Sequence, residues 1–229
     1  NWRLEKYRKN GKGLVVCPTC DTEYAQRGIT MHWNRSGCPY PEPDDYQHEV
    51  LTGLLMGDAS CVLGKSAKNP KLSLRMNTEP FLEWVADLFG VLVSDVRKDD
   101  IKSITPNMKD YIWCLNFRSA PYLHEYHSWY NSGQKRFPND LELTPTIAKM
   151  WYVCDGGVTK ESDQTWRGRV QFSVSNEDDR GDYLCELFNE HGFDPTFSHH
   201  TLRFTSDESE QLLKWMGDPL PGFEYKWEL

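Results

Sequence analysis

The chain has 229 residues, of which 38% are hydrophobic and 26% charged, and its formal net charge is −8. This composition indicates a globular protein with one sizeable core or two small ones, and no apolar run reaches the roughly 18 residues that a membrane span needs. The acidic balance argues against a uniformly basic nucleic-acid-binding protein, although an average can hide basic patches. The first residues lack the apolar centre of a signal peptide, so we expect an intracellular, cytoplasmic protein. An acidic surface would also suit a salt-rich cytoplasm.

The N-terminal part carries four residues at the spacing of a metal site. The stretch "CPTCDTEYAQRGITMHWNRSGC" contains Cys17, Cys20, His32 and Cys38 in the pattern C-x2-C-x11-H-x5-C. Thiolate and imidazole ligands at such spacings are typical of small zinc modules, in which a short helix carries the histidine. We therefore predict a zinc-finger-like module and a proline-rich linker over residues 1–45, with structural Zn²⁺. The module is either a purely structural unit or also an accessory clamp on DNA.

From residue 46 onward the chain reads as two copies of one unit. The runs "LTGLLMGDAS" (51–60) and "MWYVCDGG" (150–157) are apolar and each ends in one aspartate beside glycine. An alternating strand, a helix, further strand material and a closing helix follow each run. The predicted strands are 71–76, 111–117, 168–175 and 200–204. The predicted helices are 79–91, 119–130, 179–193 and 206–216. We predict helix N-caps at Ser119, Thr144 and Ser206, and we expect Gly156 to end the helix formed by the second apolar run. The sequence therefore predicts an α+β fold with repeats at 46–138 and 139–229.

The two lone aspartates predict a cation site. Gly53 and Gly57 allow another backbone to approach the first helix closely, so the two apolar helices can pack against each other. Asp58 and Asp155 would then meet at helix ends that are themselves partly negative, and the two carboxylates would repel each other unless a cation lies between them. Carboxylate oxygens suit Mg²⁺, and paired acids with Mg²⁺ suit hydrolysis of phosphodiester bonds.

The two runs resemble the signature helices of the LAGLIDADG homing endonucleases. The stretch "WYNSGQKRFPNDLELTPTIAKMWYVCDGG" is also similar to the segment between the repeats of that family, and the resemblance extends from about residue 46 to the C-terminus. It implies two pseudo-symmetric αββαββα repeats whose saddle-shaped antiparallel sheets face the major groove of double-stranded DNA. It also implies a monomeric enzyme that cuts both strands of a specific site with Mg²⁺, and no role at a membrane.

The resemblance implies specific roles for residues of this chain. Asp58 and Asp155 would be the catalytic metal ligands, and the backbone carbonyls of Gly57 and Cys154 would add further ligands to Mg²⁺. The family also uses a basic or polar strand residue in each repeat, for which the candidates are Arg75, Asn116, Ser173 and Arg203, and each of these could instead contact the groove or lie on the surface.

Polar residues that alternate along the predicted strands are candidates for reading the DNA. They are Ser73, Arg75, Asn77, Asn116, Arg169, Gln171, Ser173 and Arg203. Basic residues that could meet phosphates are Lys65, Lys68, Lys71, Arg97, Lys98, Lys102, Lys109 and Lys160, and we expect acids to gather on the opposite face.

Two other functions stay open at this point. The same fold could bind nucleic acid without cutting it, as an intron RNA maturase or a DNA-binding regulator. Without the resemblance, the chain would be a zinc-stabilised α+β protein with some other role. Because both signature acids are present, the sequence favours the endonuclease, which we would expect in the cytoplasm with the nucleoid. Because it shows no obvious splicing-domain block, we expect an intron-encoded or free-standing gene rather than an intein.

Overall fold

The computed structural model describes residues 14–100, 110–131, 133–159 and 168–229. Contacts divide the chain into two compact units, each described separately below. The first holds the residues up to Gln47 with Ala59–His127, and the second holds His48–Asp58 with Ser128–Leu229. Within the described ranges, no helix is both long and apolar enough to cross a membrane.

The first unit begins with a small ββα module. Strands β1 (Leu14–Val16) and β2 (Glu23–Ala25) pair antiparallel, and helix α2 (Ile29–Arg35) follows them. The C-x2-C sequence forms the turn between the strands, where Asp21 adopts a positive φ of 54°. Val15, Ile29 and Trp33 form a buried cluster with Cys17. This arrangement confirms the prediction that a short helix carries His32.

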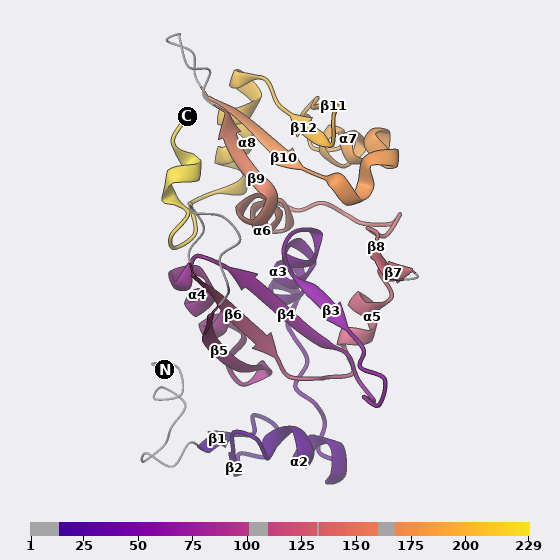
Figure 1. Cartoon of the computed structure of the whole chain (residues 1–229), viewed down its shortest axis with the longest axis vertical. Helices are drawn as coiled ribbons and strands as arrows, with labels where there is room; N and C mark the ends of the chain where they lie inside the picture. Colours follow the sequence, from indigo (N-terminus) through magenta and orange to yellow (C-terminus); the bar gives the residue numbers. More distant parts are fainter. Residues whose placement is uncertain (1–13, 101–109, 132, 160–167) are drawn as a thin grey trace. The chain divides into compact units, whose positions relative to one another are not determined.

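The rest of the first unit is a four-stranded antiparallel sheet with helices on one face (Figure 1). Its elements are β3 (Ser60–Val62), β4 (Lys71–Met76), α4 (Glu79–Phe89), β5 (Val93–Asp100), β6 (Tyr111–Phe117) and α5 (Leu123–His127). Along β4, Leu72 and Leu74 are fully buried while Ser73 and Arg75 between them are not. One face therefore packs on the helices, and we call the other the open face of the first sheet.

Hydrogen bonds join the ββα module to this sheet. The buried guanidinium of Arg118 donates from Nη1 to the Gln26 carbonyl at 2.8 Å and from Nε to the Val91 carbonyl at 2.7 Å. Gln26 donates from Nε2 to the Ser94 carbonyl at 2.9 Å, and Val91 packs against the module's core. The module is thus built onto the start of β5 rather than tethered beside it.

The second unit holds both signature helices. Helix α3 (Asp45–Met56), apart from its first residues, belongs to it, together with the short hairpin β7 (Tyr130–Asn131) and β8 (Gln134–Lys135). The remaining elements are α6 (Pro145–Asp155), β9 (Gly156–Thr159), β10 (Arg169–Ser173), α7 (Gly181–Asn189), β11 (Thr196–Ser198), β12 (Thr201–Arg203) and α8 (Ser206–Met216). Trp151 on α6 is fully buried against Phe172 and Phe188, with ring centroids 4.7 and 6.0 Å away, and this contact fixes α6 on the sheet.

The order of elements confirms the predicted fold class. Elements α3 to α5 and elements α6 to α8 both follow the order αββαββα. The two sheets have the orders β3-β4-β6-β5 and β9-β10-β12-β11, which are the same topology, and all their pairings are antiparallel. The first signature helix nevertheless belongs mainly to the second compact unit, so the compact units and the predicted sequence repeats divide the chain at different places.

Several predicted helix ends need correction. Thr144 caps α6 as predicted, since its side chain accepts from the Ile147 N–H. The cap of α8 is Thr205 rather than Ser206, because Thr205 forms a reciprocal capping box with Glu208. Ser119 caps no helix: its hydroxyl donates to the Asn69 carbonyl at 2.6 Å, and α5 begins only at residue 123. Gly156 ends α6 as predicted, but with an extended backbone instead of a left-handed one.

Candidate functional site

Helices α3 and α6 pack so closely that only glycine fits between them (Figure 1). A Cβ added to Gly53 would lie 2.4 Å from the Ile147 carbonyl oxygen, and one added to Gly57 would lie 2.2 Å from the Cβ of Cys154. These distances are far below van der Waals contact, so the prediction that small residues allow a close helix approach is confirmed. The packing aligns the C-terminal ends of the two helices.

Asp58 and Asp155 lie at these aligned ends. Asp155 is the last residue of α6, and Asp58 follows α3 by two residues. Burial, and next the charge of Asp58, raise the pKa of Asp155 to about 6, and burial also raises the pKa of Asp58. The structure therefore brings the two predicted acids together, and burial is the main cause of both raised pKa values, with the charge of Asp58 as the second cause for Asp155.

Lys135 reaches this pair from the hairpin between the repeats. Its ammonium donates to the carbonyl oxygen of Gly57 at 2.6 Å, and its charge lowers the pKa of both aspartates. Burial lowers the pKa of Lys135 itself. A lysine at the C-terminal end of α3 complements the helix dipole, and it lies on the carbonyl that the resemblance assigned to the metal.

The hairpin that carries Lys135 is anchored by a buried carboxylate. Glu177, 1% exposed, accepts from the Phe137 N–H at 2.7 Å and from Arg180 at 2.9 Å. Arg136 forms a two-pronged pair with Asp179 at 2.6 and 2.7 Å. The two residues that follow Lys135 are therefore held on a fixed backbone.

Lys226 occupies the equivalent place on the second signature helix. It donates to the carbonyls of Tyr152, Val153 and Gly156 at 3.2, 2.9 and 2.6 Å, which uses all three N–H groups of an ammonium. Its charge also lowers the pKa of both aspartates. Each repeat thus ends in a lysine that returns to the C-terminal end of its own signature helix, and sequence reasoning missed both, because each lies in a short segment far along the chain from the aspartates.

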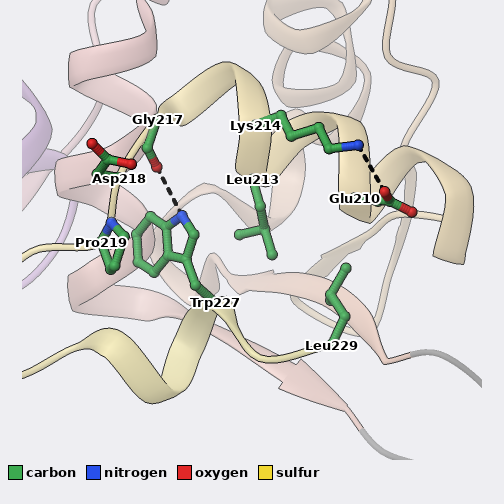
Figure 2. Close-up of a pocket in the computed structure, with 8 residues that line it drawn as sticks. All are labelled: Glu210, Leu213, Lys214, Gly217, Asp218, Pro219, Trp227 and Leu229. Atoms are coloured by element: carbon green, nitrogen blue, oxygen red, sulfur yellow. Dashed lines mark hydrogen bonds and ion pairs between the residues drawn. The ribbon is translucent and has the colours of Figure 1, made fainter.

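The tail that carries Lys226 borders a pocket of about 630 Å³ (Figure 2). The Trp227 indole donates to the Gly217 carbonyl at 2.9 Å, and Leu213 lines the pocket beside it. None of the residues that line the pocket belongs to the candidate site. The pocket is connected to the site only through the chain, because the Trp227 hydrogen bond helps to hold the adjacent Lys226 at the end of α6.

The four predicted zinc ligands form a cluster in the first unit. The ligand atoms of Cys17, Cys20, His32 and Cys38 all lie within 4.8 Å of one another. The Cys17 and Cys38 sulfurs are 3.7 Å apart, and the Cys20 sulfur lies 3.5 Å from Nε2 of His32. A tetrahedral Zn²⁺ with ordinary bond lengths has S···S edges of about 3.8 Å and S···N edges of about 3.5 Å, so the spacing of this cluster fits zinc.

The surroundings of the cluster also suit a metal. Burial raises the pKa of the Cys17 thiol, but hydrogen bonds, first among them that from the Trp33 indole at 3.2 Å, outweigh burial and lower this pKa to about 6. The Ser36 hydroxyl donates to the His32 carbonyl, so it accepts from Nδ1–H of the imidazole at 2.9 Å. In a neutral imidazole that hydrogen bond places the proton on Nδ1, so Nε2, the atom that faces Cys20, is the ring nitrogen suited to bind a metal.

The structure places most of the predicted DNA-reading residues on the open faces of the two sheets. Ser73 and Arg75 lie on the first, and Asn77 follows the end of β4 and is exposed. On the second sheet, Val170 and Phe172 are buried, whereas the alternating Arg169, Gln171 and Ser173 are not. Arg203 on β12 pairs with Gln171. A hollow of about 500 Å³ lies on this second face, lined in part by Arg169, Gln171, Thr196 and Arg203.

Two features of the first sheet differ from expectation. Asn116 is buried, and its amide donates to Asp95 at 2.9 Å. Arg97 is paired with Asp95 and Asp99 at 3.0 and 2.7 Å, so the expectation that acids gather on the opposite face is wrong for this sheet. Lys102, Lys109 and Lys160 lie outside the described residues.

Comparisons with known proteins identify the family. The homing endonuclease I-WcaI bound to its DNA recognition sequence is similar with a TM-score of 0.73 at 15% identity, over 87% of this chain and 91% of that chain. The meganuclease I-SmaMI bound to uncleaveable DNA has a TM-score of 0.44 at 11% identity, over 74% of this chain and 80% of that chain. No curated protein matches. A model of the LAGLIDADG DNA endonuclease family matches residues 48–212, which include both signature helices and both sheets, and the chain therefore belongs to that family.

Proposed function

We propose that this protein is a site-specific endonuclease that cuts both strands of a DNA target, with Mg²⁺ held between Asp58 and Asp155. The observation that carries the proposal is the pair of carboxylates at the aligned ends of α3 and α6, where the charge of one raises the pKa of the other. The pKa of Asp155 stays raised despite the charges of Lys135 and Lys226, and a divalent cation would stabilise the ionised form of such a carboxylate pair.

The donor set at these helix ends fits Mg²⁺. It consists of carboxylate oxygens and, at Gly57 and Cys154, backbone carbonyl oxygens, which are the hard ligands that Mg²⁺ takes. A bound Mg²⁺ would supply Lewis acidity toward the phosphodiester and a water of lowered pKa. Because the Gly57 carbonyl already accepts from Lys135, we propose Asp58 and Asp155 as the principal ligands and the carbonyls as secondary ones.

The two lysines divide the remaining tasks. Lys226 directs all three donors to helix-end carbonyls, so its contribution is to hold the end of α6 and to place a positive charge beside the acids. We propose Lys135 as the residue that meets the reacting phosphate, since it lies beside both aspartates on an anchored backbone. Its charge would offset the negative charge that develops on the phosphate oxygens.

The open faces of the two sheets would read the target in the major groove. The alternating Arg169, Gln171 and Ser173 on β10, with Arg203 beside them, offer donors of the kind that bind base edges. The Cys17, Cys20, His32 and Cys38 cluster would hold structural Zn²⁺. We expect one chain to act as a monomer, because it contains both repeats, each with its own signature acid.

The test is cleavage and binding of a plasmid library of randomised sites by zinc-loaded protein. Wild type, Asp58→Asn and Asp155→Asn are compared with Mg²⁺, and binding is measured separately with Ca²⁺. We expect wild type to cut, and either variant to lose cutting while it still binds with Ca²⁺. Sequence-specific binding without any cutting by wild type would refute the endonuclease and favour a non-cleaving binder on the same fold, such as a DNA-binding regulator or, with RNA as the preferred ligand, an intron maturase.

A further inference from the structure

The open face of the first sheet carries carboxylates among the residues that would face DNA. Asp95 and Asp99 lie four residues apart on β5, on the same face of the strand, and their side chains are 34% and 31% exposed. Their partner strand is β6, and Val96, on the opposite face of β5, is buried. Two neighbouring rows across the open face read Ser60–Ser73–Asn116–Asp95 and Arg75–Cys114–Arg97.

Asp95 is held in place by donors from three neighbours. Ser94 donates to its Oδ1 at 2.8 Å, and Asn116 and Arg97 donate to its Oδ2 at 2.9 and 3.0 Å. A carboxylate offers about four acceptor positions, so one remains for a ligand. The side chain is thus an oriented acceptor rather than a mobile surface charge.

Asp99 is fixed in the same way. Arg97 donates to its Oδ1 at 2.7 Å and to its Oδ2 at 3.3 Å, and Cys114 donates to Oδ2 at 3.2 Å. Hydrogen bonds from Arg97 and then Cys114 lower the pKa of Asp99, so the carboxylate stays ionised at neutral pH. Arg97 directs three of its five N–H donors to the two acids, so both carboxylates are held in a fixed orientation beside it.

The second repeat has the opposite chemistry at equivalent positions. Its corresponding row reads Gly157–Gln171–Arg203–Thr196, so Thr196 stands where the first repeat has Asp95, and Arg203 stands where it has Asn116. The Arg203 guanidinium donates to the Ser198 hydroxyl at 2.6 Å and keeps further donors. At these positions the first repeat therefore offers an oriented carboxylate, and the second repeat offers an arginine beside a threonine.

An acid that faces DNA is repelled by phosphates, unless a base offers it a donor. In the major groove the exocyclic amine of cytosine is the donor that Asp and Glu take, whereas arginine takes the acceptors of guanine. A rigid, ionised carboxylate therefore selects for an amine and against the guanine or thymine carbonyl oxygens.

We infer that Asp95 and Asp99 are specificity-determining residues of the first repeat, which accept hydrogen bonds from exocyclic base amines, cytosine first, in one half of the target. The inference rests on the proposed DNA recognition and adds to it an acceptor-based code for one half-site. The other half-site, read by Arg203 and Gln171, would present guanine and adenine to donors.

The experiment selects binding sites from a random duplex library with Ca²⁺, using zinc-loaded wild type, Asp95→Asn, Asp95→Thr and Asp99→Asn. The matched control is Asp100→Asn, which makes the same charge change on the same strand but on the opposite face. Thermal melts establish that each variant is folded. We expect the Asp95 and Asp99 variants to lose a cytosine preference in one half-site, and to bind the wild-type site about 5- to 100-fold more weakly.

The sign of the change separates recognition from general electrostatics. Removal of a negative charge near DNA by itself tightens binding to every sequence, and we expect only that small, uniform effect for Asp100→Asn. Unchanged base preferences with tighter binding in the Asp95 and Asp99 variants would overturn the inference while the proposed function stands. A wild type that selects no sequence would instead refute the proposed site-specific recognition, and the inference with it.

Discussion

Replacement of Asp155 by asparagine should stabilise the magnesium-free protein at neutral pH. Burial and the charge of Asp58 raise the pKa of Asp155 from 3.8 to about 6. Because the folded state binds this proton more tightly than the unfolded state, the ionised carboxylate destabilises the fold above pH 6, and the penalty disappears below about pH 4. About two pKa units correspond to about 3 kcal/mol, so we expect Asp155→Asn to raise the free energy of unfolding by about 2 to 3 kcal/mol at pH 7.5.

Urea denaturation, followed by circular dichroism between pH 4 and pH 8, measures this difference. The buffer contains no magnesium and no chelator, so that the zinc cluster stays loaded. The gain should fall toward zero at pH 4, and added Mg²⁺ at pH 7.5 should stabilise wild type but not the variant. The control is Asp140→Asn at an exposed aspartate, which should change little at any pH. If Asp155→Asn is as stable as wild type or less stable at pH 7.5, then the ionised Asp155 carboxylate carries no penalty in the fold and the argument for a cation beside it fails.

Three further predictions concern the helix contact, the lysine and the zinc cluster. Gly53→Ala should lower the free energy of unfolding by about 1 to 3 kcal/mol, because its Cβ would lie 2.4 Å from a backbone oxygen. Gly157→Ala, whose Cβ would meet nothing within 4 Å, should be nearly neutral in the same urea titration. Equal effects of the two substitutions would contradict the close packing of the helices. Lys135→Met should slow plasmid cleavage about 100-fold while binding with Ca²⁺ persists. The control Lys214→Met, at a lysine whose side chain is 73% exposed, should leave the cleavage rate unchanged. A Lys135 variant that cuts at the wild-type rate would show that Lys135 takes no part in the reaction. Removal of zinc by a chelator should lower the melting temperature and abolish a zinc-dependent thiolate absorbance, and Cys20→Ser should mimic both effects, so a chelator-insensitive melt would argue against a metal in the cluster.

The parts of the site that sequence predicted are those encoded within short stretches. Cys17 and His32 are recognisable because their spacing places them across one turn and one helix. The two aspartates are recognisable because each ends an apolar run beside glycine, and the glycines Gly53 and Gly57 indicate the helix contact that brings them together. In each case the spacing of the residues along the chain indicates which of them lie close together in the folded protein.

The parts that sequence did not predict depend on contacts between distant segments. Lys135 and Lys226 reach the acids from short segments about 80 and 70 residues from their acceptors, and no local pattern distinguishes them from surface lysines. Strand β5 has the sequence "VSDVRKDD", whose many polar residues conceal an alternation that becomes clear only when β6 is paired with it. The acids on its open face, Asp95 and Asp99, were therefore not expected there.

The hydrogen bonds that join the ββα module to the first sheet determine how the chain can be shortened. The family match begins at residue 48, yet a protein cut at that border would lose the Gln26 carbonyl that one N–H of the buried Arg118 guanidinium uses, and would expose Val91. Gln26 also supports Ser94, whose hydroxyl donates to both Asp95 and the Asn116 carbonyl, so the module supports the row of residues that would contact bases. A shortened protein should therefore keep β1, β2 and α2, and a graft of the first sheet onto another member of the family must carry the ββα module along.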